Sequence, residues 1–230
     1  MDTNFALPLN RYFDHTLLKA EATEEQIDEL LRQAAEYDFA AVCVNGRFVR
    51  RAAEALAETD VSTATVVGFP LGAMASAAKA EEARIAIADG ADEIDMVIPI
   101  GAAKAGRWDQ VEEEIALLAR VCHEAEGKAG PVLLKVILET CLLDDEEIIL
   151  ACQTCRVAGA DFVKTSTGFS TGGATAAALS LMKKTVGDTM KIKASGGIRT
   201  LSDALTMIEA GADRLGCSAS VKIMEEYRSR

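Results

Sequence analysis

The sequence Asp89-Gly90-Ala91-Asp92 returns almost unchanged as Ala158-Gly159-Ala160-Asp161 and as Ala210-Gly211-Ala212-Asp213. Each copy follows a stretch with the periodicity of a helix and precedes a short run rich in β-branched residues. Glycine is common just beyond the C-terminus of a helix, because it adopts the left-handed conformation without steric cost. The repeat therefore predicts that each copy ends a helix and starts a strand.

The rest of the chain continues this alternation of strands and helices. Helical stretches of about 12 to 16 residues separate the β-branched runs. Thr23 with Gln26, and Asp144 with Glu147, have the spacing of a capping box at a helix start, and Thr200 starts another helix in a similar way. We expect strands at residues 12–15, 41–44, 63–67, 93–98, 132–138, 162–165, 191–194 and 214–217.

Eight strand–helix units of about 28 residues fill the 230 residues, with no linker or low-complexity stretch between them. We therefore predict an α/β protein with a single domain, a closed (β/α)8 TIM barrel over residues 1–230. The alternative is an open doubly wound sheet, which binds its ligand near a glycine-rich first turn. The first turn here reads His15-Thr-Leu-Leu-Lys19. Because this turn lacks glycine, the barrel is favoured.

The charge balance excludes some classes of partner. The chain has 36 acidic and 24 basic residues, a formal charge of −12, whereas a nucleic-acid-binding protein needs a basic surface. No run of about 18 apolar residues could span a membrane, and the N-terminus lacks the cationic start and apolar core of a signal peptide. We expect a cytoplasmic protein without nucleic-acid or membrane partners.

The cysteines and histidines give no sign of a metal or redox site. The six cysteines are expected to stay reduced in the cytoplasm. Cys152 and Cys155 form a Cys-x-x-Cys pair, but they fall inside a helical stretch with no second ligand pair nearby, so we interpret them as small buried residues. His15 and His123 are too few for a usual histidine-rich metal site. The sequence thus predicts no metal.

Charged residues lie within otherwise apolar strands, where they are costly unless they are paired. Three lysines and two aspartates share this placement: Lys135, Lys164, Lys193, Asp14 and Asp95. Alternate side chains of a barrel strand point inwards, and functional groups gather at the C-terminal strand ends. If all five point inwards, they form one cluster of three cations and two anions.

Such a cluster can make a lysine reactive. A lysine attacks a carbonyl only when it is neutral, and about 0.04% is neutral at pH 7 with an ordinary pKa near 10.4. A second ammonium about 6 Å away would lower that pKa by about two units, and burial acts in the same direction. We expect Lys193, on the next strand, to supply this repulsion to Lys164.

Glycine-bearing turns follow the last three predicted strands, at Thr167-Gly168, Ser195-Gly196-Gly197 and Gly216-Cys217-Ser218. Glycine lets the backbone approach an anion closely, and Ser218 adds a hydroxyl. The loops after strands seven and eight frequently bind phosphate in barrels. The three turns beside the lysine pair therefore predict a phosphate site.

Four segments match the signature pattern of a known family. They read Phe162-Val-Lys-Thr-Ser-Thr-Gly-Phe169, Lys193-Ala-Ser-Gly-Gly-Ile-Arg199, Asp92-Glu-Ile-Asp-Met-Val97 and Asp14-His-Thr16. Together they resemble the 2-deoxy-D-ribose-5-phosphate aldolase family. The resemblance extends over nearly the whole chain in the same order. The segment around Lys164 is highly specific, whereas Gly-Gly-Ile-Arg also occurs in other phosphate-binding barrels.

The resemblance implies a class I aldolase that reversibly splits 2-deoxy-D-ribose 5-phosphate into acetaldehyde and D-glyceraldehyde 3-phosphate without a metal or cofactor. In this family's pattern Lys164 matches the Schiff-base lysine, Lys193 the lysine that perturbs it, and Asp95 the carboxylate of proton transfer. The supporting network is matched by Lys135 and Asp14, a pocket cysteine by Cys43, and the phosphate loops by Gly168, Gly196, Gly197, Gly216 and Ser218.

Other functions stay open at this point. A Schiff-base aldolase or transaldolase-like barrel could use the same lysine on another sugar phosphate, a pyridoxal-phosphate enzyme also combines lysine with phosphate turns, and a barrel can serve only to bind a metabolite. Pro99 and Ala219 depart from the family pattern, and because the chain ends at Arg230 we expect no long C-terminal tail over the site. Exposed barrel helices can pair, so we expect a homodimer or homotetramer.

Overall fold

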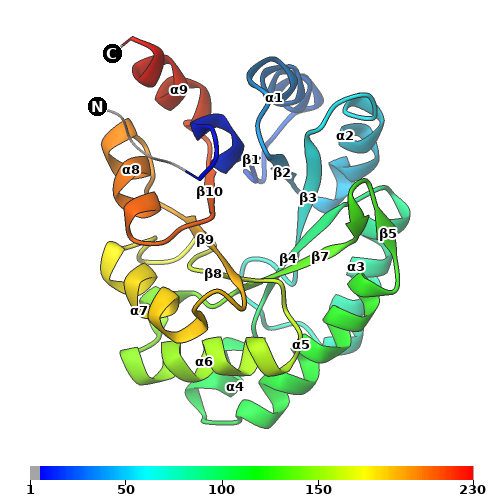
Figure 1. Ribbon diagram of the computed structural model, residues 1–230. Coiled ribbons are helices and arrows are strands. Elements are labelled where there is room, and N and C mark those ends of the chain that lie inside the picture. Colours follow the sequence, from blue (N-terminus) through cyan, green and yellow to red (C-terminus); the bar gives the residue numbers. More distant parts are fainter. Residues whose placement is uncertain (1–5, 230) are drawn as a thin grey trace.

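The structure, a computed structural model, describes residues 6–229. Eight parallel strands close into a barrel in the order β1-β10-β9-β8-β7-β4-β3-β2, and the helices form a ring around it (Figure 1). The barrel strands are β1 (Phe13–Leu17), β2 (Ala41–Val44), β3 (Ser62–Val67), β4 (Glu93–Val97), β7 (Leu133–Ile137), β8 (Phe162–Lys164), β9 (Lys191–Ser195) and β10 (Arg214–Cys217). The predicted single-domain barrel is confirmed.

The helices of the ring are α1 (Glu24–Tyr37), α2 (Val49–Ala55), α3 (Ser76–Ala88), α4 (Ile100–Lys104), α5 (Trp108–His123), α6 (Asp145–Val157), α7 (Ala176–Val186), α8 (Leu201–Glu209) and α9 (Ser220–Arg228). The predicted capping boxes at Thr23 and Asp144 are present, and Thr200 forms a third. No described helix is long and apolar enough to cross a membrane. Cys152 and Cys155 are buried within α6 and free, as expected.

The repeated segments end helices and start strands as predicted. Gly90, Gly159 and Gly211 have φ angles of 101°, 86° and 108°, which lie in the left-handed region. The aspartate that closes each repeat has a further role. The carboxylates of Asp92, Asp161 and Asp213 accept hydrogen bonds from the backbone N–H groups of Thr63, Leu134 and Ile192 at 2.8, 2.7 and 2.8 Å. The backbone N–H of each aspartate also donates a hydrogen bond to the carbonyl of the strand residue that its carboxylate accepts from. Each repeat therefore fixes the register of its strand against the preceding one.

Replacing Asp213 by alanine is expected to lower the free energy of unfolding by about 1.5 to 3 kcal/mol, because a charged hydrogen bond to a strand N–H is lost. Urea unfolding of the variant measures this loss. The matched control is Asp188→Ala, since the side chain of Asp188 in the loop before β9 is fully exposed. Equal stability of the two variants would show that the repeat aspartate does not hold the register.

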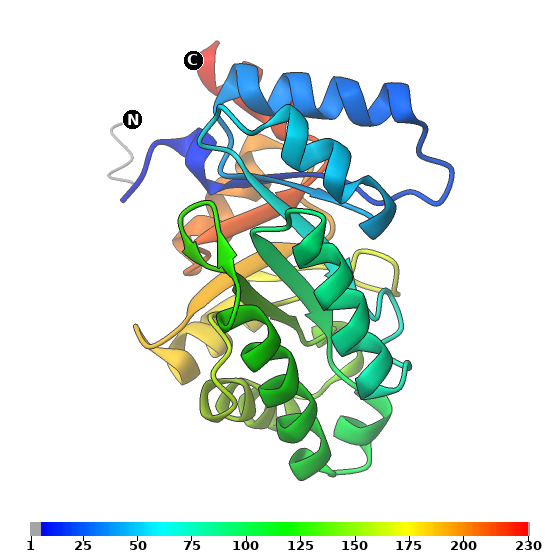
Figure 2. The same ribbon diagram turned by 90° about the vertical axis from the view of Figure 1, so that its right-hand side faces the viewer.

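One short element escaped prediction. Strands β5 (Glu126–Gly127) and β6 (Gly130–Pro131) pair as an antiparallel hairpin, and Lys128 of its turn donates to the carbonyls of Leu56, Thr59 and Val61 at 2.8, 3.2 and 3.0 Å. Strands of two residues are too short to show a periodicity, so no pattern in the sequence predicts them. The hairpin lies at one end of the barrel, whereas the loops after β3 and β8 lie at the other (Figure 2).

The barrel interior has an apolar side and a charged side. Outward-facing residues such as Ile94 and Met96 of β4 join the main core between sheet and helices. Inside the barrel, apolar side chains from β2, from β3 and from the residue that follows β1 form a separate cluster: Leu18, Ala41, Cys43, Ala64 and Val66. The charged side chains come from β1, β4, β7, β8, β9 and β10, and Cys43 of the apolar cluster lies beside them.

Candidate active site

Three buried lysines share a single carboxylate at the centre of the barrel. Asp95 of β4 accepts a hydrogen bond on Oδ1 from Lys135 of β7, at 2.8 Å. Its Oδ2 accepts from Lys164 of β8 and from Lys193 of β9, each at 2.7 Å. Lys164 and Lys193 are also paired in register on adjacent strands. Asp95 is therefore the hub that holds the three ammonium groups together.

The cluster is larger than the five residues that the sequence indicated. Glu93 lies 2.5 Å from the ammonium of Lys135 and 3.0 Å from Nη2 of Arg214. Arg214 also donates through Nε to Asp14, at 2.6 Å. Asp14 in turn pairs with Lys193 and lies 3.8 Å from Lys135. The cluster thus contains seven side chains, all buried or nearly so.

Glu93 and Arg214 were missed for different reasons. Glu93 lies two residues before Asp95 in the same strand, and residues two apart share one face of a strand. The sequence could therefore have identified it. Arg214 begins the last strand, and it meets Asp14 only because the barrel closes by pairing β10 with β1. That closing contact joins two ends of the chain and carries no local signal.

Lys164 differs from the other two lysines in its electrostatics. Burial lowers the pKa of Lys164, and repulsion from Lys193 adds to the lowering, while Asp95 opposes it. Burial also acts on Lys193, but Asp14 and Asp95 outweigh it and raise the pKa of Lys193. In Lys135, attraction to Asp95 and Glu93 likewise raises the pKa despite burial. Of the three lysines, only Lys164 is shifted toward the neutral amine.

The main cause of the lowered pKa of Lys164 differs from the predicted one. Repulsion from Lys193 was expected to be the main cause, but burial is the larger one. Lys164 is only 3% exposed, so the removal of its ammonium group from water has the larger effect on the pKa. Cys43, in the apolar cluster, is fully buried, and burial raises the pKa of its thiol. It is therefore a neutral neighbour of the cluster.

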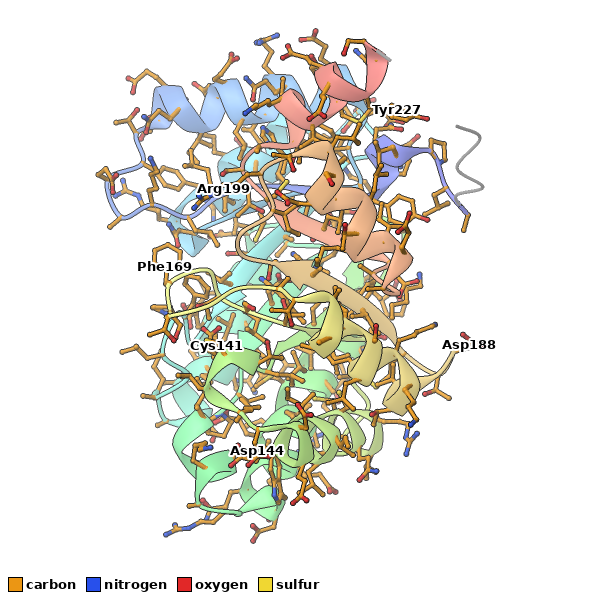
Figure 3. All side chains as sticks on the ribbon, turned by 90° about the vertical axis from the view of Figure 1, so that its left-hand side faces the viewer. Cys141, Asp144, Phe169, Asp188, Arg199 and Tyr227 are labelled. Carbon is orange, nitrogen blue, oxygen red and sulfur yellow. The ribbon has the colours of Figure 1, made fainter. Side chains whose placement is uncertain are left out.

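Lys164 is also the cluster member that lines a cavity open to solvent. The cavity has a volume of about 240 Å³ and lies where the strands end. Its wall includes the predicted turn residues Gly168, Gly196, Gly197, Gly216 and Ser218. Lys19, Phe169 and Arg199 line it as well and were not predicted. Figure 3 shows Phe169 and Arg199 at this end of the barrel and Asp188 at the opposite end.

Gly173, in the loop between β8 and α7, packs directly on the glycine turn at Gly196. A Cβ atom on Gly173 would lie 2.3 Å from the carbonyl oxygen of Gly196, so no side chain fits there. The N–H of Ala174 donates to the carbonyls of Ser195 and Gly196, both at 3.0 Å. Gly216 has another role, since a Cβ there would lie 3.0 Å from Cε of Lys193. The glycines therefore shape the cavity and leave room for a lysine.

Glu139 holds the loop after β8 in place through hydrogen bonds to Thr167. This residue is buried, with a φ of 58°. Its carboxylate accepts hydrogen bonds from the hydroxyl of Thr167 and from the N–H of Thr167, at 3.3 and 3.4 Å for the N–H. Thr167 lies between Lys164 and Gly168 in the cavity wall. Glu139 thus fixes the segment that joins the lysine to the first glycine turn.

A larger cavity, of about 400 Å³, lies at the other end of the barrel beside the β5–β6 hairpin. Glu93 lines it, and none of the predicted site residues does. Among residues 6–229, no group of three histidine, cysteine, aspartate or glutamate side chains is arranged to hold a metal ion.

A family model described as DeoC/LacD family aldolase matches residues 9–225. The chain belongs to this family. Family membership favours aldolase chemistry over the pyridoxal-phosphate and metabolite-binding alternatives.

Relatives within this family match the chain over almost its whole length. A deoxyribose-phosphate aldolase of Streptococcus suis is 55% identical over 218 residues, 95% of this chain and 96% of the relative. The deoxyribose-phosphate aldolase of Streptococcus gordonii is 56% identical over 219 residues, with the same coverage. A tetrameric deoxyribose phosphate aldolase from Aeropyrum pernix superposes with a TM-score of 0.88 at 33% identity, covering 96% of this chain and 91% of that one.

The buried carboxylates of the cluster make the aldolase sensitive to acid. Burial would raise the pKa of Asp14 and Asp95. Arg214, Lys193 and Lys135 together outweigh it at Asp14, and the three lysines outweigh it at Asp95, so both pKa values are lowered. A carboxylate with a lowered folded-state pKa contributes stability above its unfolded value, near 3.9, and this is lost as the pH falls further. We expect the free energy of unfolding to fall steeply below about pH 4. Urea unfolding at pH 7, 5 and 3 measures this, and a weaker pH dependence is expected in Asp14→Asn.

Proposed function

We propose that the chain reversibly cleaves 2-deoxy-D-ribose 5-phosphate into acetaldehyde and D-glyceraldehyde 3-phosphate, through a Schiff base on Lys164. One observation carries the proposal. Lys164 is the lysine of the cluster whose pKa is lowered and also the one that lines the cavity. A neutral amine exposed to a substrate cavity is what a Schiff-base aldolase requires. The names of the relatives indicate the sugar phosphate.

The covalent steps follow from the position of Lys164. Its neutral Nζ attacks the C1 aldehyde of the open-chain sugar, and loss of water from the adduct leaves an iminium ion. Removal of the proton from the C3 hydroxyl breaks the C2–C3 bond, and the electron pair moves into the iminium to give an enamine. Glyceraldehyde 3-phosphate departs at this step. Protonation of the enamine at C2 and hydrolysis of the new iminium release acetaldehyde and restore the amine.

Asp95 and Lys193 act around this intermediate. The iminium carries the same positive charge as an ammonium, so the carboxylate of Asp95, 2.7 Å from Nζ of Lys164, stabilises it. Asp95, directly or through a water molecule, takes the proton of the C3 hydroxyl. The pKa of Asp95 lies well below its usual value, which favours the route through water, because such a carboxylate is a weak base. Lys193 holds Asp95 in place from the adjacent strand.

The phosphate end of the substrate would lie against the three glycine turns. Gly168, Gly196, Gly197, Gly216 and Ser218 all line the same cavity as Lys164. Backbone N–H groups of such turns bind phosphate oxygens when glycine permits close approach. The exposed cations Lys19 and Arg199 at the cavity wall add favourable charge.

Substitution of Gly173 tests the phosphate end. A methyl group there collides with the Gly196 carbonyl and pushes the turn at Gly196 away from the loop that carries Gly173. We expect Gly173→Ala to raise KM for the phosphorylated substrate roughly tenfold, about 1.4 kcal/mol of binding, with a smaller effect on unphosphorylated 2-deoxyribose. Gly101→Ala is the control, because nothing lies within 4 Å of a Cβ at Gly101. An equal rise in KM for both sugars would show that the glycine turns do not bind the phosphate.

The experiment that tests the proposed function measures acetaldehyde released from 2-deoxy-D-ribose 5-phosphate by the purified chain. A second sugar phosphate, fructose 1,6-bisphosphate, serves as the comparison. Cleavage of fructose 1,6-bisphosphate yields no acetaldehyde, so glyceraldehyde 3-phosphate, a product of both cleavages, is measured for each substrate. We expect it from the deoxy sugar and not from fructose 1,6-bisphosphate. Cleavage of the second substrate alone would assign the same lysine to a different aldolase reaction.

The oligomeric state and the compartment are also proposals. The relative from Aeropyrum pernix is tetrameric by its description, and we propose that this chain forms a homodimer or homotetramer through its exposed helices. The six cysteines are free, which supports a cytoplasmic location. The acidic net charge supports small-molecule substrates over nucleic acid as the binding partner.

A further inference from the structure

The buried cluster holds one more cation than anion. Its cations are Lys135, Lys164, Lys193 and Arg214, and its anions are Asp14, Glu93 and Asp95. An uncompensated charge is costly in a buried site, so a cluster with an excess charge tends to lose or gain a proton. Loss of one proton makes this cluster neutral. Because its members interact strongly, they titrate as a unit.

The number of carboxylates around each cation decides which proton is lost. Lys135 lies within 4.0 Å of three carboxylates, and Lys193 and Arg214 of two each. Lys164 has a single one, Asp95, which it shares with both other lysines. Lys164 is therefore the cation that is held least, and the neutral cluster is the one in which Lys164 is the free amine.

We propose that Arg214 and Glu93, at the end of the barrel away from the substrate cavity, set the protonation state of Lys164 through this charge count. Neither residue lines the cavity that opens on Lys164. Arg214 adds the fourth cation, and Glu93 adds the third anion. The two residues touch each other and act on Lys164 through Asp14, Lys135 and Asp95, so they are positioning residues. The inference rests on the proposed function of Lys164.

The other groups that face Lys164 do not change this count. Asp95 faces it from β4, Lys193 from β9 and the neutral thiol of Cys43 from β2. Lys135 on β7 and Asp14 on β1 form the next layer, already counted in the cluster. Lys19 and Arg199 at the cavity wall are exposed, so water and salt screen their charges.

Two substitutions should shift the pH profile in opposite directions. Arg214→Gln removes a cation, so the cluster is balanced with Lys164 protonated, and the acid limb of kcat/KM should move up by about one pH unit. Glu93→Gln removes an anion and should move the limb down by about as much. The double variant removes one charge of each sign, so its pH profile of kcat/KM should lie close to that of the wild type. Arg214→Lys keeps the positive charge and should keep the wild-type pH profile.

The pH profile is measured with 2-deoxy-D-ribose 5-phosphate and, independently, as acetaldehyde-dependent borohydride labelling of Lys164 by mass spectrometry. A merely structural role would lower activity in both single variants without opposite shifts, and that result overturns the inference. If Arg214→Gln does not fold, Glu93→Gln alone decides. An acid limb of kcat/KM that stays in place or moves to higher pH in this variant overturns the inference. A wild-type chain that labels at Lys164 but does not cleave the sugar would instead contradict the proposed function.

Discussion

Replacing Lys164 by alanine is expected to lower kcat/KM for deoxyribose 5-phosphate cleavage by at least roughly 10⁴-fold, because the group that forms the covalent intermediate is absent. The other two lysines cannot replace it, since Lys135 and Lys193 have raised pKa values and do not line the cavity. Acetaldehyde release in steady state measures the loss.

Two controls keep this result specific. Lys184→Ala removes an exposed lysine of α7 and should leave kcat/KM unchanged. Lys164→Arg keeps a positive charge next to Asp95 but, since arginine stays protonated, should be as inactive as the alanine variant. Residual activity within tenfold of wild type in either Lys164 variant would place the nucleophile elsewhere.

Replacing Asp95 by asparagine is expected to reduce both activity and stability. Three buried ammonium groups lose their common partner, and removing one side of a buried pair typically costs about 3 to 5 kcal/mol. The iminium also loses its counter-ion, and the C3 hydroxyl loses its proton acceptor. We expect kcat/KM to fall roughly 10² to 10⁴-fold.

Stability and activity are measured separately, by urea unfolding and by acetaldehyde release below the unfolding transition. Asp188→Asn, at a fully exposed side chain, should change neither. A stable and fully active Asp95→Asn would contradict the role of Asp95 as hub of the cluster. A destabilised variant with unchanged kcat would restrict that role to folding.

The barrel could be predicted because its signals are local. A glycine after each helix and a run of β-branched residues before the next helix are readable within a few positions, and the predicted strands agree with the structure to within about two residues. The hydrogen bonds of Asp92, Asp161 and Asp213 could not be predicted, because each joins residues 21 to 29 positions apart. The β5–β6 hairpin was too short to show a pattern.

Some residues of the candidate site could likewise be predicted from the sequence and others could not. Lys135, Lys164, Lys193, Asp14 and Asp95 stand out because a charge within an apolar strand needs a partner. Arg214 stands at the start of a strand, where charges are common, so its burial depends on closure of the barrel. The larger effect of burial than of repulsion on the pKa of Lys164 likewise depends on how completely the barrel encloses the side chain, which only the three-dimensional arrangement shows.

The central claim is that Lys164 forms the Schiff base, and trapping tests it most directly. The chain is treated with acetaldehyde and sodium borohydride, digested and analysed by mass spectrometry. The account predicts a single ethyl adduct, on Lys164, together with loss of cleavage activity in proportion to labelling. An adduct on Lys135 or Lys193 in place of Lys164, or complete inactivation without any adduct, would contradict it.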